Sequence, residues 1–153
     1  MDKKAISLYK TIRLIHWALL TPMLLFAVFA YISNLGADRS DQKGLEVLIY
    51  LPLFMMVMAI TAGRFLYSRN IAKSRGKVFN TRLQIFMTAT IIRDAFYEAA
   101  GLTAGVAAYI TGNNTILLLI PIILLQFYAS RPTHLKIEND LEATRDEMKA
   151  LCD

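Results

Sequence analysis

Four long apolar runs divide this chain of 153 residues, and they constrain its fold more than any other feature. They lie at about 16–35, 45–67, 92–111 and 115–130. An α-helix rises about 1.5 Å per residue, so about 20 apolar residues cross the hydrocarbon core of a bilayer. We therefore predict an all-α integral membrane four-helix bundle over residues 1–130. A short cytoplasmic helix or tail is expected over residues 131–153.

The composition agrees with this interpretation. The chain is 56% hydrophobic and 19% charged, whereas a soluble domain has about 45–50% apolar and about 25% charged residues. One water-soluble domain of this length could not bury so many apolar side chains. The composition thus excludes a disordered chain, a disulfide scaffold and a multidomain enzyme.

The basic residues are placed unevenly along the chain. Fourteen of the 17 Lys and Arg residues precede the first run, fall between Arg64 and Arg82, or follow the fourth run, whereas only Arg39 and Lys43 lie between the first two runs. Cytoplasmic loops of membrane proteins are enriched in Lys and Arg. The pattern predicts a multi-pass protein of the bacterial inner membrane with both termini in the cytoplasm. This topology, with attraction to anionic membrane lipids, accounts for the net charge of +5 without a nucleic-acid partner.

A weak internal repeat connects the two halves of the chain. A shift of 78 residues aligns 30–33 (AYIS) with 108–111 (AYIT), and Pro52 and Pro121 each lie about six residues into the second helix of their hairpin. Apolar composition alone also produces some of these matches. Two parallel-repeat hairpins around a pseudo-twofold axis along the membrane normal are therefore one possible arrangement.

Charged residues interrupt the third run. Arg93, Asp94 and Glu98 fall close together, and a charge at the centre of a membrane helix costs about 2.5–3.5 kcal/mol on insertion scales. Glu98 is expected deepest, about 20 Å from the outer boundary. Helical spacing places the two carboxylates on one stripe with small residues that let another helix approach. The stripe comprises Asp94, Glu98, Gly101, Gly105 and Ala108.

The other runs are expected to bring polar side chains to the same cytoplasmic half: His16, Thr61, Arg64 and Gln126. Two hypotheses for Glu98 follow. Its carboxylate either binds and releases a proton or a cation, or it forms a fixed ion pair with Arg64 or Arg93 that orients the helices. The outer half of the predicted membrane region has few polar residues for an ion path, which favours the fixed pair.

The sequence contains no pattern typical of an enzyme or a metal protein. Cys152 is the only cysteine, so no internal disulfide can form. His16 and His134 lack neighbouring ligand residues in the sequence, and we find no catalytic Ser/His/Asp grouping, glycine-rich phosphate loop or HExxH motif. The chain is predicted to be non-enzymatic and to bind no metal or other cofactor.

Several stretches carry a resemblance to a known group of proteins. They are 91–102 (IIRDAFYEAAGL), 108–113 (AYITGN), 131–133 (RPT), Lys136-Ile137 and Asp140-Leu141. In them the chain resembles small uncharacterised four-helix inner-membrane proteins that are common in Bacteroidota. It differs in having Ala99 where a glycine usually follows the glutamate, and Asp94 where a neutral residue is usual. The resemblance implies an inner-membrane location.

A weaker analogy links Glu98 and the small residues that follow it to the proteolipid c-subunits of rotary ATPases. In those subunits the membrane carboxylate lies on the second helix of a hairpin. Glu98 lies on the first helix of its predicted hairpin, and the dense glycine repeat of that family is absent here.

These observations predict a non-enzymatic polytopic membrane protein that acts as a homo-oligomer or as an accessory subunit of a membrane complex. Its contacts would be with lipids and membrane subunits. The alternative is a small ion- or proton-coupled carrier or channel in which Glu98 titrates. Candidate ion- or proton-binding residues are Glu98, Asp94, Arg93, Arg64, His16 and Gln126, and candidate helix-packing residues are Gly101, Gly105, Ala108, Pro52 and Pro121.

Overall fold

The computed structural model describes residues 3–36 and 47–152. Its helices are α1 (Lys3–Asn34), α2 (Val47–Ala72), α3 (Phe79–Thr111), the 3₁₀ helix η1 (Asn114–Leu118), α4 (Leu119–Ser130), α5 (His134–Leu141) and α6 (Arg145–Cys152). No strand occurs in these residues, so the all-α prediction is confirmed for them. Arg39 and Lys43, on which the predicted topology partly depends, lie outside the described residues.

Two helices are long and apolar enough to cross a membrane, over Ala5–Asn34 and Val47–Ala72. The segment Asn114–Ser130 together with α5 would provide a third span, although the pair is bent by 70°. The first helix begins at Lys3, well before the apolar run that predicted it. The reason is that Lys3 to Ile15 contains neither proline nor glycine, so nothing in this polar stretch interrupts the helix.

α3 does not qualify as a span by composition, although it is the longest helix, with 33 residues and a length of about 50 Å. Arg93, Asp94 and Glu98 interrupt its apolar character. The predicted span 92–111 is the second part of one continuous helix that already begins at Phe79. It ends at Gly112, which takes the left-handed conformation (φ 65°) that closes many helices.

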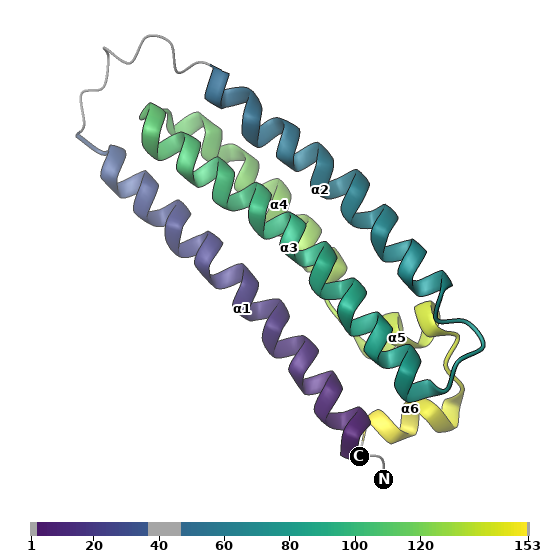
Figure 1. The fold of residues 1–153 in the computed structure, drawn as a ribbon. Helices are drawn as coiled ribbons and strands as arrows, with labels where there is room; N and C mark the ends of the chain where they lie inside the picture. The colour runs from purple at the N-terminus through teal and green to yellow at the C-terminus, as the bar shows by residue number, and fades with distance from the viewer. Residues whose placement is uncertain (1–2, 37–46, 153) are drawn as a thin grey trace.

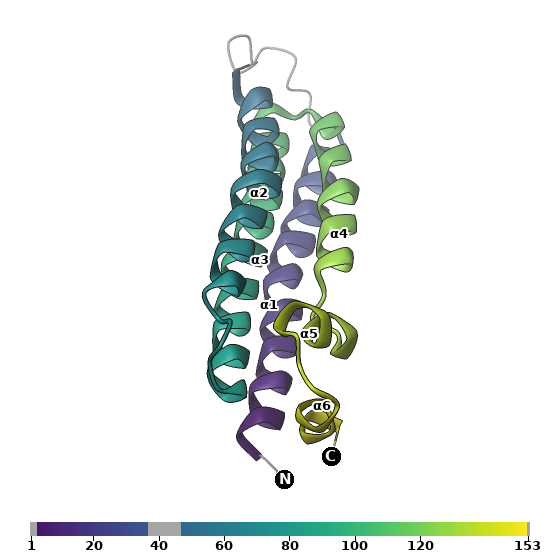
Figure 2. The same ribbon diagram turned by 90° about the vertical axis from the view of Figure 1, so that its right-hand side faces the viewer.

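The helix that carries Arg93, Asp94 and Glu98 is also the central one of the four long helices. In Figure 1, α3 lies between α1 and α2, and α4 lies behind it; Figure 2 shows α2 and α3 on one side of the bundle and α4 on the opposite side. α3 packs against α1, α2 and α4. The helices alternate in direction, so α1 starts and α6 ends at the end of the bundle where α2 connects to α3 (Figure 1).

Two glycines allow the close contact between α1 and α3. A Cβ atom at Gly101 would lie 2.1 Å from Met23 Sδ, and one at Gly105 would lie 2.7 Å from Phe26 Cδ1. Met23 and Gly101 are 78 residues apart, the same shift that aligns the internal repeat. The two hairpins are nevertheless packed unequally, because α3 is central and α1 is peripheral.

The C-terminal segment forms two short helices rather than the single helix predicted. Glu142 adopts a left-handed conformation (φ 51°) that separates α5 from α6. Thr133 caps the first of these helices, since its Oγ1 accepts a hydrogen bond from Lys136 N at 3.2 Å. Both helices dock on the bundle through buried Ile137, Leu141 and Leu151, which pack with the start of α1 and of α3.

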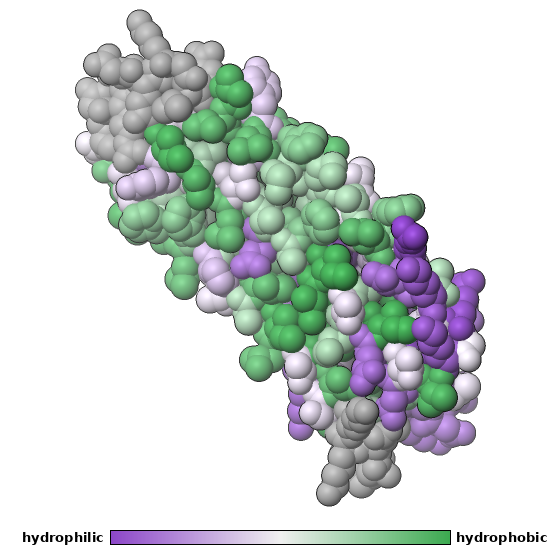
Figure 3. Space-filling view, in the orientation of Figure 1, coloured by the Kyte–Doolittle hydropathy of each residue, from purple (hydrophilic) through white to green (hydrophobic). Residues whose placement is uncertain are grey.

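The surface of the bundle has two distinct regions. Large apolar side chains are exposed along α1 and α2, including Leu25 (67%), Phe54 (60%) and Trp17 (56%). Figure 3 shows that hydrophilic side chains gather at the end where α2 connects to α3 and where α5 and α6 lie. Soluble monomers rarely expose so continuous an apolar surface.

Candidate functional site

Three ionisable residues are buried together where α1 packs on α3. His16 comes from α1, and Arg93 and Asp94 are consecutive in α3; their exposed fractions are 3%, 3% and 1%. His16 Nδ1 lies 2.6 Å from Asp94 Oδ2, and Arg93 Nε and Nη2 donate to Asp94 Oδ1 at 3.2 and 3.1 Å. One carboxylate therefore accepts hydrogen bonds from two other buried groups. We call His16, Arg93 and Asp94 the charged cluster.

Arg93 extends the charged cluster to the two remaining long helices. Its Nη2 also donates to the carbonyl oxygen of Ser130 at 2.7 Å, and its Cζ lies 4.5 Å from the centre of the Tyr67 ring in α2. Ser130 is the last residue of α4, where a helix leaves carbonyl groups without intrahelical donors. Pro132 follows and cannot continue the helix. The cluster thereby connects α1, α2, α3 and α4.

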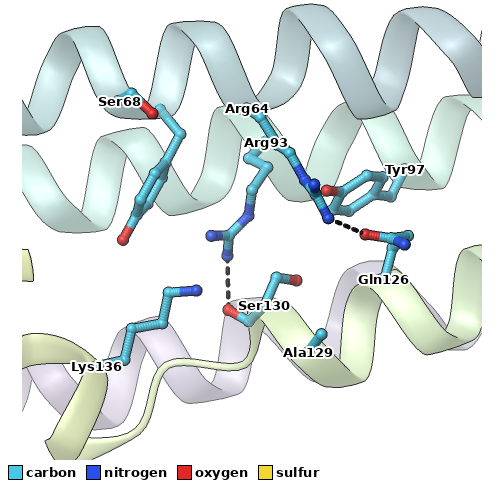
Figure 4. A pocket seen from close by; sticks show the side chains of 9 residues that line it. Arg64, Ser68, Arg93, Tyr97, Gln126, Ala129, Ser130 and Lys136 are labelled. Carbon is cyan, nitrogen blue, oxygen red and sulfur yellow. Dashed lines mark hydrogen bonds between the residues drawn. The ribbon is translucent and has the colours of Figure 1, made fainter.

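A polar pocket of about 260 Å³ lies beside Arg93, between α2, α3 and the α4–α5 region. Figure 4 shows the side chains of Arg64, Arg93 and Lys136 converging on it from different helices. The residues that line it are Arg64, Tyr67, Ser68, Arg93, Tyr97, Gln126, Ala129, Ser130 and Lys136. None of them is acidic. We call this the basic pocket.

The basic pocket is held by contacts between helices. Arg64 Nη2 donates to Gln126 Oε1 at 2.7 Å (Figure 4). The Tyr67 hydroxyl donates to Asp140 of α5, and Lys136 Nζ lies 5.6 Å from the centre of the Tyr67 ring. Burial of Lys136, and the positive charge of Arg93 nearby, lower the pKa of that ammonium group.

Glu98 lies apart from both features. It is partly buried and forms no hydrogen bond or ion pair with any described residue. The expected ion pair with Arg93 or Arg64 is not formed, because Arg93 binds Asp94 and Arg64 binds Gln126. Glu98 follows Asp94 by four residues, which rotates its side chain by about 40° around the axis of α3. Asp94 is therefore buried against α1, whereas Glu98 is partly exposed on the face of α3 that points away from the bundle.

The predicted packing residues have several environments. Gly101, Gly105 and Ala108 are buried within the chain, with both glycines against α1. Pro52 is buried in α2, whereas Pro121 is exposed in α4. The stripe of small residues is thus used inside the molecule.

Two further polar residues from the sequence analysis, Thr61 and His134, do not join the charged cluster. Thr61 is exposed and its hydroxyl donates to Val57 O of its own helix at 2.7 Å. His134 packs against Tyr9, with ring centres 4.5 Å apart and ring planes tilted by 46°. No group of three His, Cys, Asp or Glu side chains that could hold a metal ion occurs in the part of the chain that the structure describes.

Sequence reasoning missed Tyr67, Tyr97, Ser130, Lys136 and Asp140 as residues of the site. One signal was available: Lys136 and Asp140 are four residues apart and therefore share one face of α5. Nothing in the sequence shows that this face packs on α2.

A second, apolar groove of about 530 Å³ lies between α1 and α4. Its lining residues are His16, Trp17, Leu20, Pro121, Leu124, Leu125, Tyr128 and Arg131. The single residue in this lining with a permanent charge is Arg131, in the segment that follows α4. We call this apolar groove the α1–α4 groove.

Comparison of the chain with protein-family models, with curated proteins and with solved structures found no match. What is established is an all-helical protein with two helices long and apolar enough to cross a membrane.

Proposed function

We propose that this chain is a non-enzymatic polytopic protein of the bacterial inner membrane that works as a homo-oligomer or as an accessory subunit of a larger membrane complex. In this proposal the bundle has four spans and both termini lie in the cytoplasm. The observation that carries it is the unpaired carboxylate of Glu98 on the outer face of the central helix.

The distribution of side chains supports a location in the membrane. The exposed faces of α1 and α2 are apolar over most of their length, and basic residues gather at the end where α2 connects to α3, from Arg64 to Arg82. Lys and Arg are enriched on the cytoplasmic side. The resemblance of the chain to four-helix inner-membrane proteins of Bacteroidota supports the same location.

Glu98 supports contact with a second chain. A carboxylate at its expected depth is expensive unless a cation, a donor or a proton neutralises it. Its helical neighbours Ala95 and Leu102 lie on the same side of α3, and Ala95 is a small exposed residue that allows another helix to come close. A donor from a second copy or from another subunit would complete this site.

The α1–α4 groove supports the same role. Its lining is almost wholly apolar, and its volume of about 530 Å³ can accept bulky side chains of a partner helix. Trp17 and Tyr128, both more than half exposed, form part of its walls.

A small ion- or proton-coupled carrier is the second candidate, and the same observation favours it. A carboxylate without an ionic partner is free to bind a proton or a cation. The charged cluster is less suited to this task, because His16, Arg93 and Asp94 are already bound to one another.

The substitution Glu98→Gln separates the two functions, with Glu138→Gln on the exposed face of α5 as the matched control. We would measure the oligomeric state in lipid nanodiscs by native mass spectrometry, and proton and cation flux in proteoliposomes. A subunit role predicts that Glu98→Gln weakens assembly and that neither protein conducts. A carrier role predicts unchanged assembly and flux that is lost only in Glu98→Gln. A monomeric wild-type protein that conducts nothing and co-purifies with no partner chain would contradict both.

A further inference from the structure

We propose that the basic pocket binds a phosphate group, either as the headgroup of an anionic phospholipid or as free phosphate. Its position between α2, α3 and α5 gives three cations a common target. The phospholipid source rests on the proposed membrane location, and the free phosphate source does not.

Two of the three cations form no ion pair with a described residue. The one described hydrogen-bond partner of Arg64 is the neutral amide of Gln126. Lys136 contacts the ring of Tyr67, and no carboxylate lies within 4.0 Å of its ammonium group in the described structure. The nearest acid, Asp140, accepts the hydrogen bond of the Tyr67 hydroxyl. Positive charge in this pocket is therefore left for an anion to neutralise.

Arg93 is held ready for the same ligand. Asp94, the carbonyl of Ser130 and the ring of Tyr67 fix the guanidinium group, which is 3% exposed and still lines the pocket. An arginine already fixed in place loses little conformational entropy when it binds an oxyanion. Guanidinium groups also match the geometry of phosphate oxygens.

The remaining lining residues suit an oxyanion. Ser68 and Tyr97 carry hydroxyl groups, and the amide nitrogen of Gln126 adds a further donor beside the oxygen that Arg64 binds. The volume of about 260 Å³ is below the range of about 300–1,000 Å³ of pockets for drug-sized ligands. A phosphate group with a short ester fits better than a nucleotide.

Native mass spectrometry of the full chain in detergent would test the site. One probe is phosphatidylglycerol, with zwitterionic phosphatidylcholine, which has no net charge, as the comparison. The other is inorganic phosphate, whose binding is measured by its effect on the melting temperature. The variants are Arg64→Gln and Lys136→Gln. Arg69→Gln, exposed on α2 and outside the pocket, is the matched control.

We expect each pocket variant to lose affinity by about tenfold or more, because each substitution removes a charged hydrogen-bond donor to the phosphate. Retention of phosphatidylglycerol identifies the lipid source, and stabilisation by inorganic phosphate alone identifies free phosphate. Binding of neither probe, or equal binding by the pocket variants and the control, would overturn the proposal. Failure of the membrane location would appear separately, as a wild-type protein absent from the membrane fraction.

Discussion

Asp94 is the one buried acidic residue in the part of the chain that the structure describes. It is 1% exposed and its two carboxylate oxygens accept from His16 on one side and Arg93 on the other. Burying charges costs several kcal/mol per ion, and only good geometry with further hydrogen bonds offsets that cost. The carbonyl of Ser130 and the ring of Tyr67 supply those further contacts to Arg93.

The first prediction concerns this carboxylate. Asp94→Asn keeps the shape of the side chain but leaves the buried charge of Arg93 without its counterion. We expect a loss of about 3–5 kcal/mol of stability, as is usual when one partner of a buried pair is removed. Thermal unfolding in detergent would measure it, with Asp146→Asn, whose side chain is 93% exposed, as the control. Equal melting temperatures for the two variants would mean that the charged cluster does not stabilise the bundle.

At the scale of the helix, the packing of α1 on α3 depends on the absence of two side chains. Gly101 meets Met23 and Gly105 meets Phe26 at distances that leave no room for a Cβ atom. Gly63 in α2 differs, because a Cβ atom there would lie 3.5 Å from its nearest neighbour, an ordinary contact. Small residues have this use wherever helices pack closely.

We therefore predict that Gly101→Ala destabilises the protein by about 1–3 kcal/mol, the usual cost of overpacking. Gly63→Ala is the matched control and should be neutral or slightly stabilising, because alanine favours helix. In a double-mutant cycle with Met23→Ala, the pair should lose less stability than the sum of the single changes. Additive losses would show that Met23 is not the clashing residue.

Besides the buried side chain of Leu151, polar contacts at the start of α6 connect this helix to the bundle. Thr144 N donates to Glu147 Oε2 at 2.9 Å, and Glu147 N donates to Thr144 Oγ1 at 3.4 Å, a capping box. Arg82 of α3 donates to Glu147 Oε1 and to the carbonyl of Leu141, both at 2.5 Å. A single arginine thus holds the end of α5 and the start of α6.

This arrangement predicts that α6 detaches in acid. Burial of Glu147 would raise its pKa, but hydrogen bonds from Thr144 and Arg82 and the charge of Arg82 outweigh burial and hold the pKa below its usual value. The stabilisation is present above the unfolded pKa of about 4.3 and is lost as pH falls through the lower folded value. Hydrogen exchange of the amides of α6, corrected for intrinsic rates, should rise below about pH 4. Glu147→Gln should raise it at neutral pH, whereas Glu138→Gln should not.

For the molecule as a whole, topology is the property that the charge pattern predicts and a simple fusion can test. We expect a fluorescent protein fused to the C-terminus to fluoresce and alkaline phosphatase at the same position to be inactive, because both report a cytoplasmic end. Alkaline phosphatase activity would contradict the positive-inside interpretation. It would also move the basic pocket to the opposite side of the membrane.

Much of the secondary structure of this molecule could be predicted from its sequence. The apolar runs located α1 to α4, and a helix was expected within residues 131–153. The ends of helices were less predictable: α1 and α3 extend well beyond their apolar runs, because polar residues continue a helix as readily as apolar ones. The break at Glu142 was missed because a glutamate in a left-handed conformation leaves no clear sequence signal.

The candidate site was predicted in part. The sequence indicated one layer that contains Arg93, Asp94, Glu98, His16, Thr61, Arg64 and Gln126. The structure brings His16, Arg93 and Asp94 together as the charged cluster and places Arg64 and Gln126 in a neighbouring pair, whereas Thr61 and Glu98 join neither. The sequence did not indicate which acid binds the arginine. Asp94 and Glu98 differ by only about 40° around the helix axis, so the rotation of α3 decides between them.

The sequence by itself determined the helical class, the spacing of the apolar runs and the uneven distribution of basic residues, because these depend on residue type and on a helical period that is local to the chain. Only the tertiary structure decided that α3 is central, and that Asp94 is buried in the charged cluster while Glu98 is partly exposed. It also decided that Lys136 of α5 joins Arg64 and Arg93 at the basic pocket. Those outcomes depend on how helices far apart in the chain rotate and pack, and packing is set by contacts that no single segment contains.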